Sequence, residues 1–433
     1  MRISKTWLVA AILLAALVAT VSAADWPNWR GPVYNGSSPE TGLPATWSRT
    51  EGVAWSGPLP GPADATPVIA GDRVFISSTD AGSGALLAMA FSATDGKRLW
   101  QARLGTNAKA PRNTMASPSP TTDGKTVVFL YGTGEMAGLT CDGRILWRRN
   151  LGDEFGKMSI KYGYSSSPLF YDGRVYVQML RRPWAYPYNP GKSTTEAREK
   201  RLTSFLMAIE PTTGKTLWGQ VRKTDAVDES FESYGTPLPV AVADRTDMVL
   251  SGADYVTGHD PATGRERWRW GYNSNHRNMQ RLIPSVTPGA SRVFAPLPRG
   301  SRLVALAIGD TDARQVWTHD GPTSDSATPL LYDGALYVMD SDRKDLRALD
   351  PETGKERWKV RLGGAVWRAS PTGADGKIYC ISRDAEVAVL KAGAQGEVLS
   401  RIDMGGKQTH ASIAVAGGRL YIRTADRLWC IGK

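Results

Sequence analysis

Cysteine is scarce in this chain, with three residues among 433, namely Cys141, Cys380 and Cys430. They form no C-x-x-C motif and no adjacent pair, which excludes a haem-attachment motif and a dense disulfide framework. We expect small buried thiols, although a disulfide between Cys380 and Cys430 stays open. No cysteine precedes Cys141, so we expect no lipid-attachment cysteine at a processed N-terminus.

The motifs of the common enzyme classes are also missing. The chain has no G-x-S-x-G elbow, no P-loop and no dinucleotide-binding fingerprint. Its four histidines, His259, His276, His319 and His410, lack the spacing of zinc ligands. No stretch has the pattern of a long amphipathic helix, whereas 45 glycines and 27 prolines suit many tight turns. The sequence therefore favours a nearly all-β protein and counts against hydrolase and nucleotide-binding functions.

A repeated turn that ends in tryptophan is the main positive feature. Each copy runs from an apolar strand through an acidic turn into a second strand, as in DPETGKERW. An acidic side chain that accepts turn N–H groups and a glycine free to adopt positive φ make this segment a β-hairpin. The six copies end at Trp100, Trp147, Trp218, Trp268, Trp317 and Trp358.

A second signature lies upstream of these hairpins. A serine or threonine before proline opens a strand, and a Gly-Arg/Lys turn leads into an aromatic and aliphatic strand, as in SPLFYDGRVYV from Ser167. Two hairpins per repeat give a four-stranded antiparallel sheet of about 40 to 50 residues, the size of one propeller blade. The chain is therefore predicted to be an all-β propeller.

The ends of the chain set the predicted number of blades at eight. A seventh repeat begins at Ser370 with Ser400 in place of the tryptophan, and an eighth begins near Ser412 but ends without an outer strand. The segment GVAWSGPLP, which contains Trp55, offers the missing strand from the N-terminal side. We therefore predict an eight-bladed propeller over residues 53–433 whose last blade is closed by an N-terminal strand. A seven-bladed ring is the competing interpretation.

The first residues resemble an export signal. Arg2 and Lys5 precede an apolar run that ends in small residues suited to cleavage, so residues 1–23 are expected to be removed, with an uncleaved anchor as the alternative. Residues 24–52 then form an N-terminal arm. We expect a periplasmic or secreted protein with no transmembrane segment after cleavage.

Basic residues outnumber acidic ones. Without Arg2 and Lys5, 51 basic residues remain against 42 acidic ones, a net charge of +9. This surplus favours acidic partners, but the charges are scattered over the turns without a basic helix or a nucleic-acid-binding motif. We therefore expect a solvated basic surface, no nucleic acid as a partner, and a monomer.

The repeat D-x-x-T-G-x-x-x-W, together with the Ser/Thr-Pro strand openings, resembles the PQQ-type repeat of quinoprotein-like propellers. It differs from WD40 repeats, because aspartate never follows a repeat tryptophan. The resemblance covers the chain from about Val53 to the C-terminus. It implies that the tryptophans pack between neighbouring blades, which assigns the six repeat tryptophans and Trp55 to the structure.

Two branches of that superfamily imply different functions. Quinoprotein dehydrogenases oxidise alcohols or sugars with PQQ and Ca²⁺, and they hold the quinone between a tryptophan and a disulfide of adjacent cysteines. This chain has no adjacent cysteines, and no Glu, Asn and Asp set aligns with the metal ligands of those enzymes. The chain more closely resembles the propeller lipoprotein of the outer-membrane β-barrel assembly machinery, a non-catalytic docking platform, although the lipid-attachment cysteine is missing.

Candidate binding residues lie on the face around the channel mouth, which carries the loops between blades and between each blade's two middle strands. The third repeat has an insertion at about 181–201, in which aromatic residues alternate with prolines beside arginines. Rigid aromatic side chains beside cations favour a binding surface, while a loop that only covers its own blade is the alternative. The insertion contributes Arg181, Arg182, Trp184, Tyr186 and Tyr188.

Other candidates recur just before the strand-opening serine or threonine of several repeats. Their shared place in the repeat would bring them to the channel entrance from different blades, whereas ordinary loop residues are the alternative. Turn aspartates such as Asp342 recur in most repeats and are not nominated as ligands or bases. The candidates are Arg112, Tyr162, Tyr164, Tyr234, His276, Arg277, Trp367, Arg368 and His410.

Together these patterns predict an exported, non-catalytic propeller that serves as a scaffold in the cell envelope. Its predicted partner is an envelope protein or an anionic polymer, and we expect no cofactor, no metal and no catalytic residue. The alternative is a PQQ-dependent dehydrogenase acting on an alcohol or sugar, which would need PQQ and Ca²⁺.

Overall fold

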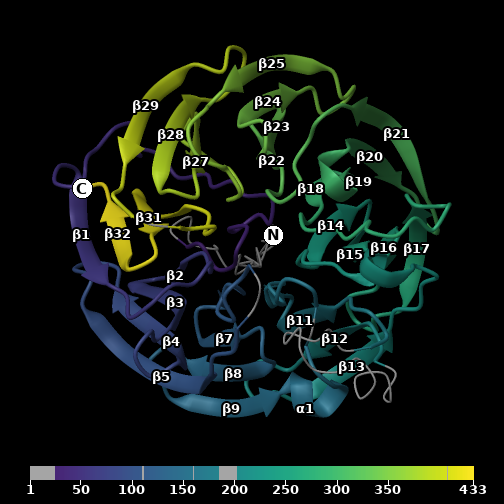
Figure 1. The fold of residues 1–433 in the computed structure, drawn as a ribbon, viewed down its shortest axis with the longest axis horizontal. Coiled ribbons are helices and arrows are strands. Elements are labelled where there is room, and N and C mark those ends of the chain that lie inside the picture. The colour runs from purple at the N-terminus through teal and green to yellow at the C-terminus, as the bar shows by residue number, and fades with distance from the viewer. Residues whose placement is uncertain (1–24, 110–111, 159, 185–201, 407) are drawn as a thin grey trace, which may run out of the picture.

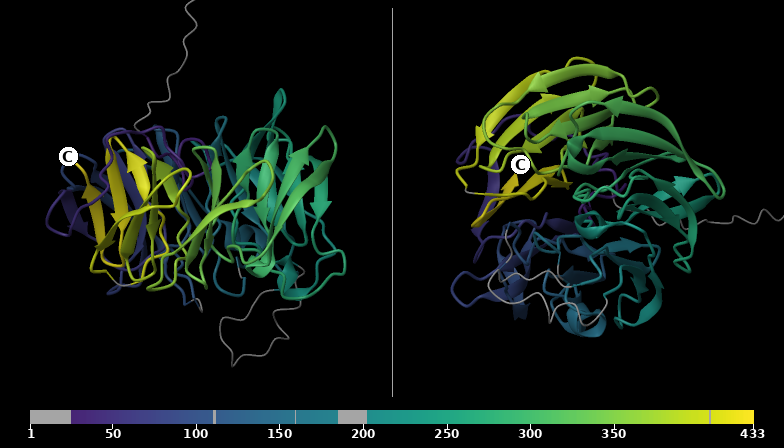
Figure 2. Two further views of the ribbon diagram at one scale, coloured as in Figure 1. Left: turned by 90° about the horizontal axis from the view of Figure 1, so that it is seen from above. Right: turned by 45° about the vertical axis from the view of Figure 1, so that its right-hand side comes forward.

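The computed structural model describes residues 25–109, 112–158, 160–184, 202–406 and 408–433. These residues form eight four-stranded antiparallel sheets arranged radially around a central axis (Figure 1). Seen from the side, the blades form a short cylinder (Figure 2). The predicted eight-bladed propeller is confirmed, and the seven-bladed alternative is excluded.

Blades 1 to 7 are meanders that run outward from the axis. Blades 1 to 4 comprise β2 (Val68–Ala70), β3 (Arg73–Thr79), β4 (Ala85–Ser92) and β5 (Arg98–Thr106); β6 (Thr121–Thr122), β7 (Thr126–Leu130), β8 (Glu135–Thr140) and β9 (Ile145–Asn150); β10 (Leu169–Tyr171), β11 (Arg174–Met179), β12 (Phe205–Ile209) and β13 (Thr216–Val221); and β14 (Leu238–Val242), β15 (Arg245–Gly252), β16 (Tyr255–His259) and β17 (Glu266–Gly271). Blades 5 to 7 comprise β18 (Thr287–Gly289), β19 (Arg292–Pro296), β20 (Arg302–Ile308) and β21 (Ala313–Asp320); β22 (Leu330–Tyr332), β23 (Ala335–Asp340), β24 (Asp345–Leu349) and β25 (Glu356–Arg361); and β26 (Thr372–Ala374), β27 (Lys377–Ile381), β28 (Glu386–Lys391) and β29 (Val398–Asp403).

Blade 8 joins the two ends of the propeller. Its inner strands are β30 (Ala414–Ala416), β31 (Arg419–Arg423) and β32 (Arg427–Ile431), and its outer strand is β1 (Val53–Pro58). β1 runs antiparallel to β32 and lies beside it in Figure 1. The strand expected from the N-terminal side therefore completes the last blade.

Helical structure is nearly absent from the described residues. The one-turn helix α1 (Leu151–Phe155) follows β9 and is capped by the side chain of Asn150. Two 3₁₀ turns, η2 (Asp228–Phe231) and η3 (Pro298–Gly300), lie in loops. No helix in this part of the chain is long and apolar enough to cross a membrane.

A ring of serine and threonine residues ties the blades together around the channel. In each blade, the residue two positions before the innermost strand donates its backbone N–H to the side-chain hydroxyl of its counterpart in the next blade, at 2.7–3.2 Å. Proline follows six of the eight residues and favours the extended backbone that this geometry needs. The ring residues are Thr66, Ser119, Ser167, Thr236, Ser285, Thr328, Ser370 and Ser412.

The repeat tryptophans join neighbouring blades farther from the axis. The indole N–H of Trp100, on β5, donates to the carbonyl of Cys141 in the next blade at 2.8 Å. The indole also lies against Gly143, where φ is +91° and an added Cβ would sit 2.6 Å from the ring. The same indole, carbonyl and glycine contact recurs at Trp55, Trp147, Trp218, Trp317 and Trp358.

Trp268 in blade 4 departs from this pattern. The hairpin of blade 5 that would receive it reads GDTDAR and lacks the glycine with positive φ that each of the other receiving turns places against the indole. The indole N–H of Trp268 instead donates to Asp247 Oδ2 within its own blade at 2.8 Å. Arg245 and Arg267 also contact the Asp247 carboxylate, so this buried charge is fully paired.

The N-terminal arm closes one end of the channel. Trp26 forms a β-bridge with Ile69 in blade 1, and Ser37 forms one with Gly373 in blade 7. Between them, the buried guanidinium of Arg30 donates to carbonyls in blades 6 and 7. The arm therefore crosses the channel and links blades that lie far apart in the sequence.

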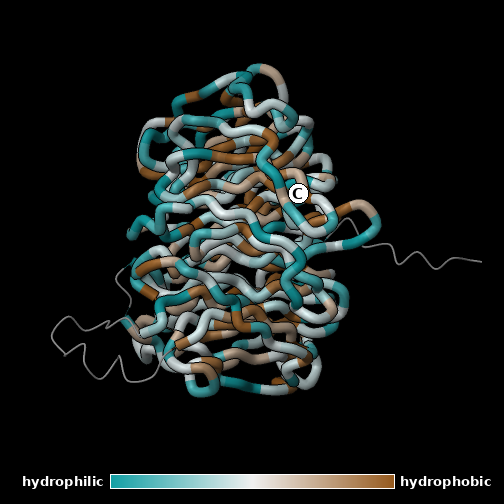
Figure 3. Tube along the Cα trace, turned by 90° about the vertical axis from the view of Figure 1, so that its right-hand side faces the viewer, coloured by the Kyte–Doolittle hydropathy of each residue, from teal (hydrophilic) through white to brown (hydrophobic). Residues whose placement is uncertain are grey.

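The apolar core fills the spaces between blades. One cluster joins Val128 of blade 2 to Val175 and Met207 of blade 3. Hydrophilic residues occupy many of the turns along the outer edges (Figure 3). All three cysteines are free thiols, and Cys380 and Cys430 are buried in this core, so the disulfide that the sequence left open is not formed.

Gly354→Ala should destabilise the fold more than the matched change Gly334→Ala. Both glycines have φ near +70° (+71° and +67°), so alanine introduces a similar backbone strain of about 1 kcal/mol at each position. A Cβ at position 354 would also lie 2.5 Å from the Trp317 ring, whereas one at 334 meets no atom within 4 Å. We expect Gly354→Ala to lose about 1–3 kcal/mol more in the free energy of unfolding, measured with urea. Equal losses of unfolding free energy in the two variants would contradict a tight contact between the tryptophan and the glycine.

Ser370→Ala should destabilise the ring, whereas Ser370→Thr should preserve it. Alanine leaves the buried N–H of Thr328 without its acceptor, at a cost of about 1–3 kcal/mol. Threonine keeps the hydroxyl and already occupies the equivalent place at Thr66, Thr236 and Thr328. Urea unfolding of both variants measures the difference. Equal stability of the two variants would refute a stabilising role for the hydroxyl.

Candidate functional site

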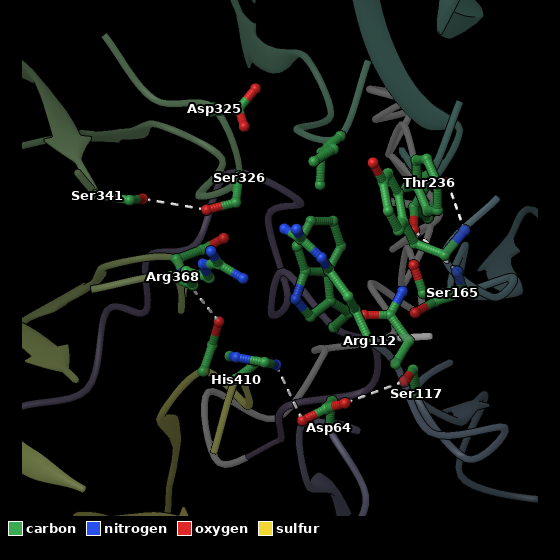
Figure 4. A pocket seen from close by; sticks show the side chains of 18 of the residues that line it. Asp64, Arg112, Ser117, Ser165, Thr236, Asp325, Ser326, Ser341, Arg368 and His410 are labelled. Carbon is green, nitrogen blue, oxygen red and sulfur yellow. Dashed lines mark hydrogen bonds and ion pairs between the residues drawn. The ribbon is translucent and has the colours of Figure 1, made fainter. Parts of the chain in front are cut away.

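A cup at the open mouth of the channel is the candidate site (Figure 4). Its cavity volume is about 180 Å³. The loops that lead into the innermost strands form its walls, and Trp29 of the arm contributes to the lining from the closed end. The cup thus lies on the face that carries the loops between blades.

One lining residue comes from each blade at the same place in the repeat, two residues before the ring serine or threonine. Side chains alternate in direction along an extended chain, so this residue and the ring residue face the same way. The residue between them is Ala, Pro, Ser or Gly in every blade, which leaves room for close packing. The eight side chains are Asp64, Ser117, Ser165, Tyr234, Ile283, Ser326, Arg368 and His410.

Asp64 is the centre of a polar cluster on one wall. Its carboxylate contacts His410 Nδ1 at 3.2 Å and accepts a hydrogen bond from Ser117 Oγ at 3.1 Å (Figure 4). Burial would raise the pKa of this carboxyl, but the bonds from His410 and Ser117 and the charge of Arg423 outweigh burial and lower it. The Asp64 carboxylate is therefore ionised and already partnered.

Tyr162 and Tyr234 form the aromatic wall, with ring centroids 6.4 Å apart. The backbone N–H of Tyr162 donates to the Tyr234 hydroxyl at 3.1 Å, and that hydroxyl donates to the buried Glu232 carboxylate at 3.2 Å. Burial and the charge of Glu232 raise the pKa of Tyr234 well above its ordinary value, so the phenol stays protonated. The guanidiniums of Arg112 and Arg281 each lie 5.0 Å from the centre of the Tyr162 ring.

The three arginines of the cup differ in their acidic partners. Arg281 contacts Glu229 at 3.0 Å and Asp325 at 3.7 Å. Arg112 and Arg368 make no ion pair with any described residue. The cup therefore contains two positive charges without an acidic partner.

Five of the predicted binding residues line the cup, and seven lie elsewhere among the described residues. Tyr164 and Trp367 are fully buried and donate hydrogen bonds to the carbonyls of Gln178 at 2.6 Å and Gly363 at 2.9 Å. These two side chains hold loops in place. The five in the cup are Arg112, Tyr162, Tyr234, Arg368 and His410.

His276 and Arg277 lie on an exposed turn of blade 4 and do not line the cup. The two ring nitrogens of His276 each lie 3.6 Å from a carboxylate oxygen, one of Asp225 and one of Asp254. In blade 5, to which this loop leads, the lining position two residues before the ring serine is occupied by Ile283 instead.

The base of the blade 3 insertion is internal rather than exposed. Arg181 is 1% exposed and donates to the carbonyls of Phe155, Gly156 and Lys157 at the end of α1. Burial lowers the pKa of Arg181 to about 10.

Arg182, the next residue of the insertion, pairs with Asp228 at 2.9 Å and Glu232 at 2.8 Å. Both arginines therefore anchor the fold, which the sequence pattern did not anticipate. Trp184 is half-buried, and Tyr186 and Tyr188 lie outside the described residues.

Several lining residues were missed by the sequence analysis. Asp342 was set aside as a turn residue, yet it lies on the cup. Counting two residues back from each ring serine or threonine would have found most of the others. The missed residues include Asp64, Ser117, Ser165, Arg281, Ile283, Asp325, Ser326 and Asp342.

The cup does not fit PQQ and Ca²⁺ as the quinoprotein dehydrogenases hold them. No cysteine lines it, so the sulfur side of the quinone sandwich has no counterpart. Of its three carboxylates, Asp64 is held by His410 and Ser117, Asp325 faces Arg281, and Asp342 alone has no such partner among the described residues. These side chains do not supply a free set of oxygen ligands for Ca²⁺.

Comparison with solved structures shows the same fold at low sequence identity. One similar structure is quinohemoprotein alcohol dehydrogenase from Comamonas testosteroni, with 14% identity and a TM-score of 0.67 over 95% of this chain and 81% of that chain. A europium-containing methanol dehydrogenase has 9% identity and a TM-score of 0.65 over 95% of this chain and 99% of that chain. BamB from Moraxella catarrhalis has 15% identity and a TM-score of 0.59 over 87% of this chain and 96% of that chain. A search of curated proteins finds no match.

A family profile covers most of the propeller. The profile described as outer membrane protein assembly factor BamB matches residues 39–186, 203–342 and 301–394, which together exceed half of the chain. The matched residues include the N-terminal closing strand β1 but not the inner strands of blade 8. The chain therefore belongs to the family described as outer membrane protein assembly factor BamB.

Proposed function

We propose that this protein is an exported, non-catalytic docking propeller of the cell envelope, which binds a protein partner across the face that carries the cup. The arrangement of the side chains on that face supports the proposal. Every blade contributes a side chain to the cup, and the arm closes the opposite end of the channel. A partner would therefore meet polar groups from the whole ring on one side of the molecule. Membership in the BamB family supports a role in assembly rather than in chemistry.

The polar cluster of the cup is not arranged for nucleophilic catalysis. In a serine nucleophile system, the histidine accepts the proton of the serine hydroxyl, and the carboxylate orients the histidine from its far side. Here Asp64 stands between Ser117 and His410, and the Ser117 hydroxyl donates to the carboxylate. No histidine therefore contacts the Ser117 hydroxyl in this cluster, and the Thr114 carbonyl, at 2.7 Å, is a nearer acceptor for its hydrogen than Asp64.

Apolar side chains near the cup suit a protein partner. Val227 and Met279 are 38% and 49% exposed on neighbouring loops of the same face. The loop of Met279 is held by a hydrogen bond from Arg299 Nε to the Met279 carbonyl at 2.7 Å. Exposed apolar residues on a fixed loop beside a polar cavity are typical of protein-binding surfaces.

The cellular location and the nature of the partner extend this proposal. Residues 1–23 have the pattern of an export signal but lie outside the described residues. A net charge of +9 after removal of Arg2 and Lys5 also suits an anionic envelope polymer as partner. We favour a protein because the exposed apolar residues would gain little from a charged polymer.

A photo-crosslinking residue at Met279 should capture a discrete partner in living cells, whereas the same residue at Leu99 should not. The two side chains are almost equally exposed, at 49% and 47%, but Leu99 lies on outer strand β5, away from the cup. Crosslinked species are detected by immunoblot and identified by mass spectrometry. Equal capture from both positions, or none from Met279, would contradict docking on this face.

Deletion of residues 185–201 should leave the fold intact and reduce partner capture from Met279. The deletion must spare Arg181 and Arg182, because both anchor the protein interior. The thermal midpoint should stay within a few degrees of the parent while crosslinking falls at least several-fold. Unchanged crosslinking in a folded deletion variant would remove the insertion from the docking surface.

A further inference from the structure

We propose that the cup binds a small oxyanion, a molecule with carboxylate or phosphate groups, above the hydroxyl ring. This ligand adds to the docking function proposed above and does not depend on it. Its test uses the purified protein alone, so its failure would leave the docking face unaffected. Three independent features of the cup support the inference.

The first feature is a set of unused hydrogen-bond donors. Each ring hydroxyl accepts a backbone N–H from the neighbouring blade, but none donates to an acceptor among the described residues. A serine or threonine hydroxyl carries one hydrogen to donate. The ring side chains are only 1–5% exposed, and five of them line the cup. An oxyanion would accept hydrogen bonds from these buried hydroxyls.

The second feature is a buried positive charge beneath the ring. Arg30 is 1% exposed and donates to the carbonyls of Asn35, Pro329 and Pro371 at 2.6–3.2 Å, with no carboxylate partner among the described residues. Pro329 and Pro371 directly follow two ring residues, so this guanidinium lies just below the ring. A buried charge that only carbonyl dipoles balance leaves a positive potential in the channel.

The third feature is a pair of arginines above the ring. Arg112 and Arg368 come from blades 2 and 7 and line the cup without any ion-pair partner in the described chain. The Arg112 guanidinium lies over the aromatic ring of Tyr162, 5.0 Å from the centre of that aromatic ring. An arginine that rests on an aromatic ring is oriented in advance, and its planar guanidinium matches the oxygens of a carboxylate or phosphate.

The acidic residues of the cup do not cancel this charge. Asp64 is paired with His410, and Asp325 faces Arg281. Asp342 remains as an exposed carboxylate on a hairpin turn. Counting Arg30, the positive groups without an acidic partner outnumber the free carboxylates, which favours an anion over a cation.

The size of the cup limits the ligand. A volume of about 180 Å³ is below the range of about 300–1,000 Å³ that is usual for sites of drug-sized ligands. It suits a compact molecule with a few oxygen atoms. Citrate and inorganic phosphate are therefore suitable probes, since they separate carboxylate from phosphate chemistry.

Calorimetric titration at constant ionic strength tests the inference. We expect saturable binding of citrate or phosphate with one site per chain, and the tighter of the two identifies the preferred headgroup. Arg112→Gln and Arg368→Gln should each weaken binding at least tenfold. Arg361→Gln removes the same charge from outer strand β25, outside the cup, and should change the affinity less than twofold.

Circular dichroism and thermal melting show that each variant is folded before titration. Absence of saturable heat for both probes with the unaltered protein would overturn the inference. So would equal weakening by Arg361→Gln and the two cup variants, because binding would then follow net charge rather than the site.

Discussion

The hydrogen bond from each ring amide to the hydroxyl of the next blade is the interaction on which the rest of the structure depends. This hydrogen bond recurs eight times and forms a closed ring, because the backbone N–H of Ser412 in blade 8 donates to the Thr66 hydroxyl in blade 1. The ring sets where every innermost strand begins, and the tryptophan contacts set how the outer strands approach one another. Two sets of contacts at different distances from the axis leave neighbouring blades little freedom to rotate, so loops from distant parts of the chain meet at one defined mouth.

The same geometry places the site at the mouth of the channel. It does not by itself determine the chemistry of that site. Any residue two positions before the ring faces the channel, whatever its side chain. Related propellers place different chemistry on this scaffold, so a shared fold does not determine function. In this chain the eight positions hold three serines, Asp64, Tyr234, Ile283, Arg368 and His410. That set contains no sulfur atom, and its one carboxylate is already paired with His410.

Much of the fold could be predicted because its causes are local. The tryptophan hairpins and the Ser/Thr-Pro openings each fit within about ten residues, so eight blades and the closing strand follow from counting. The site was harder, because Asp64 and Ser117 carry no motif and gain meaning only from their place relative to the ring. Arg181 looked like a loop cation, yet it packs on carbonyls more than 20 residues away in sequence. Such long-range contacts leave no periodic pattern.

The most direct test of a non-catalytic role is calorimetric titration of the mature protein with PQQ, with and without Ca²⁺. PQQ carries carboxylates, so weak binding that ignores calcium is compatible with an anion-binding cup. We predict no calcium-dependent component, because the cup offers neither the sulfur contact nor a free set of metal ligands. Saturable, calcium-dependent binding with one site per chain would contradict this prediction and identify the protein as a quinone-dependent enzyme.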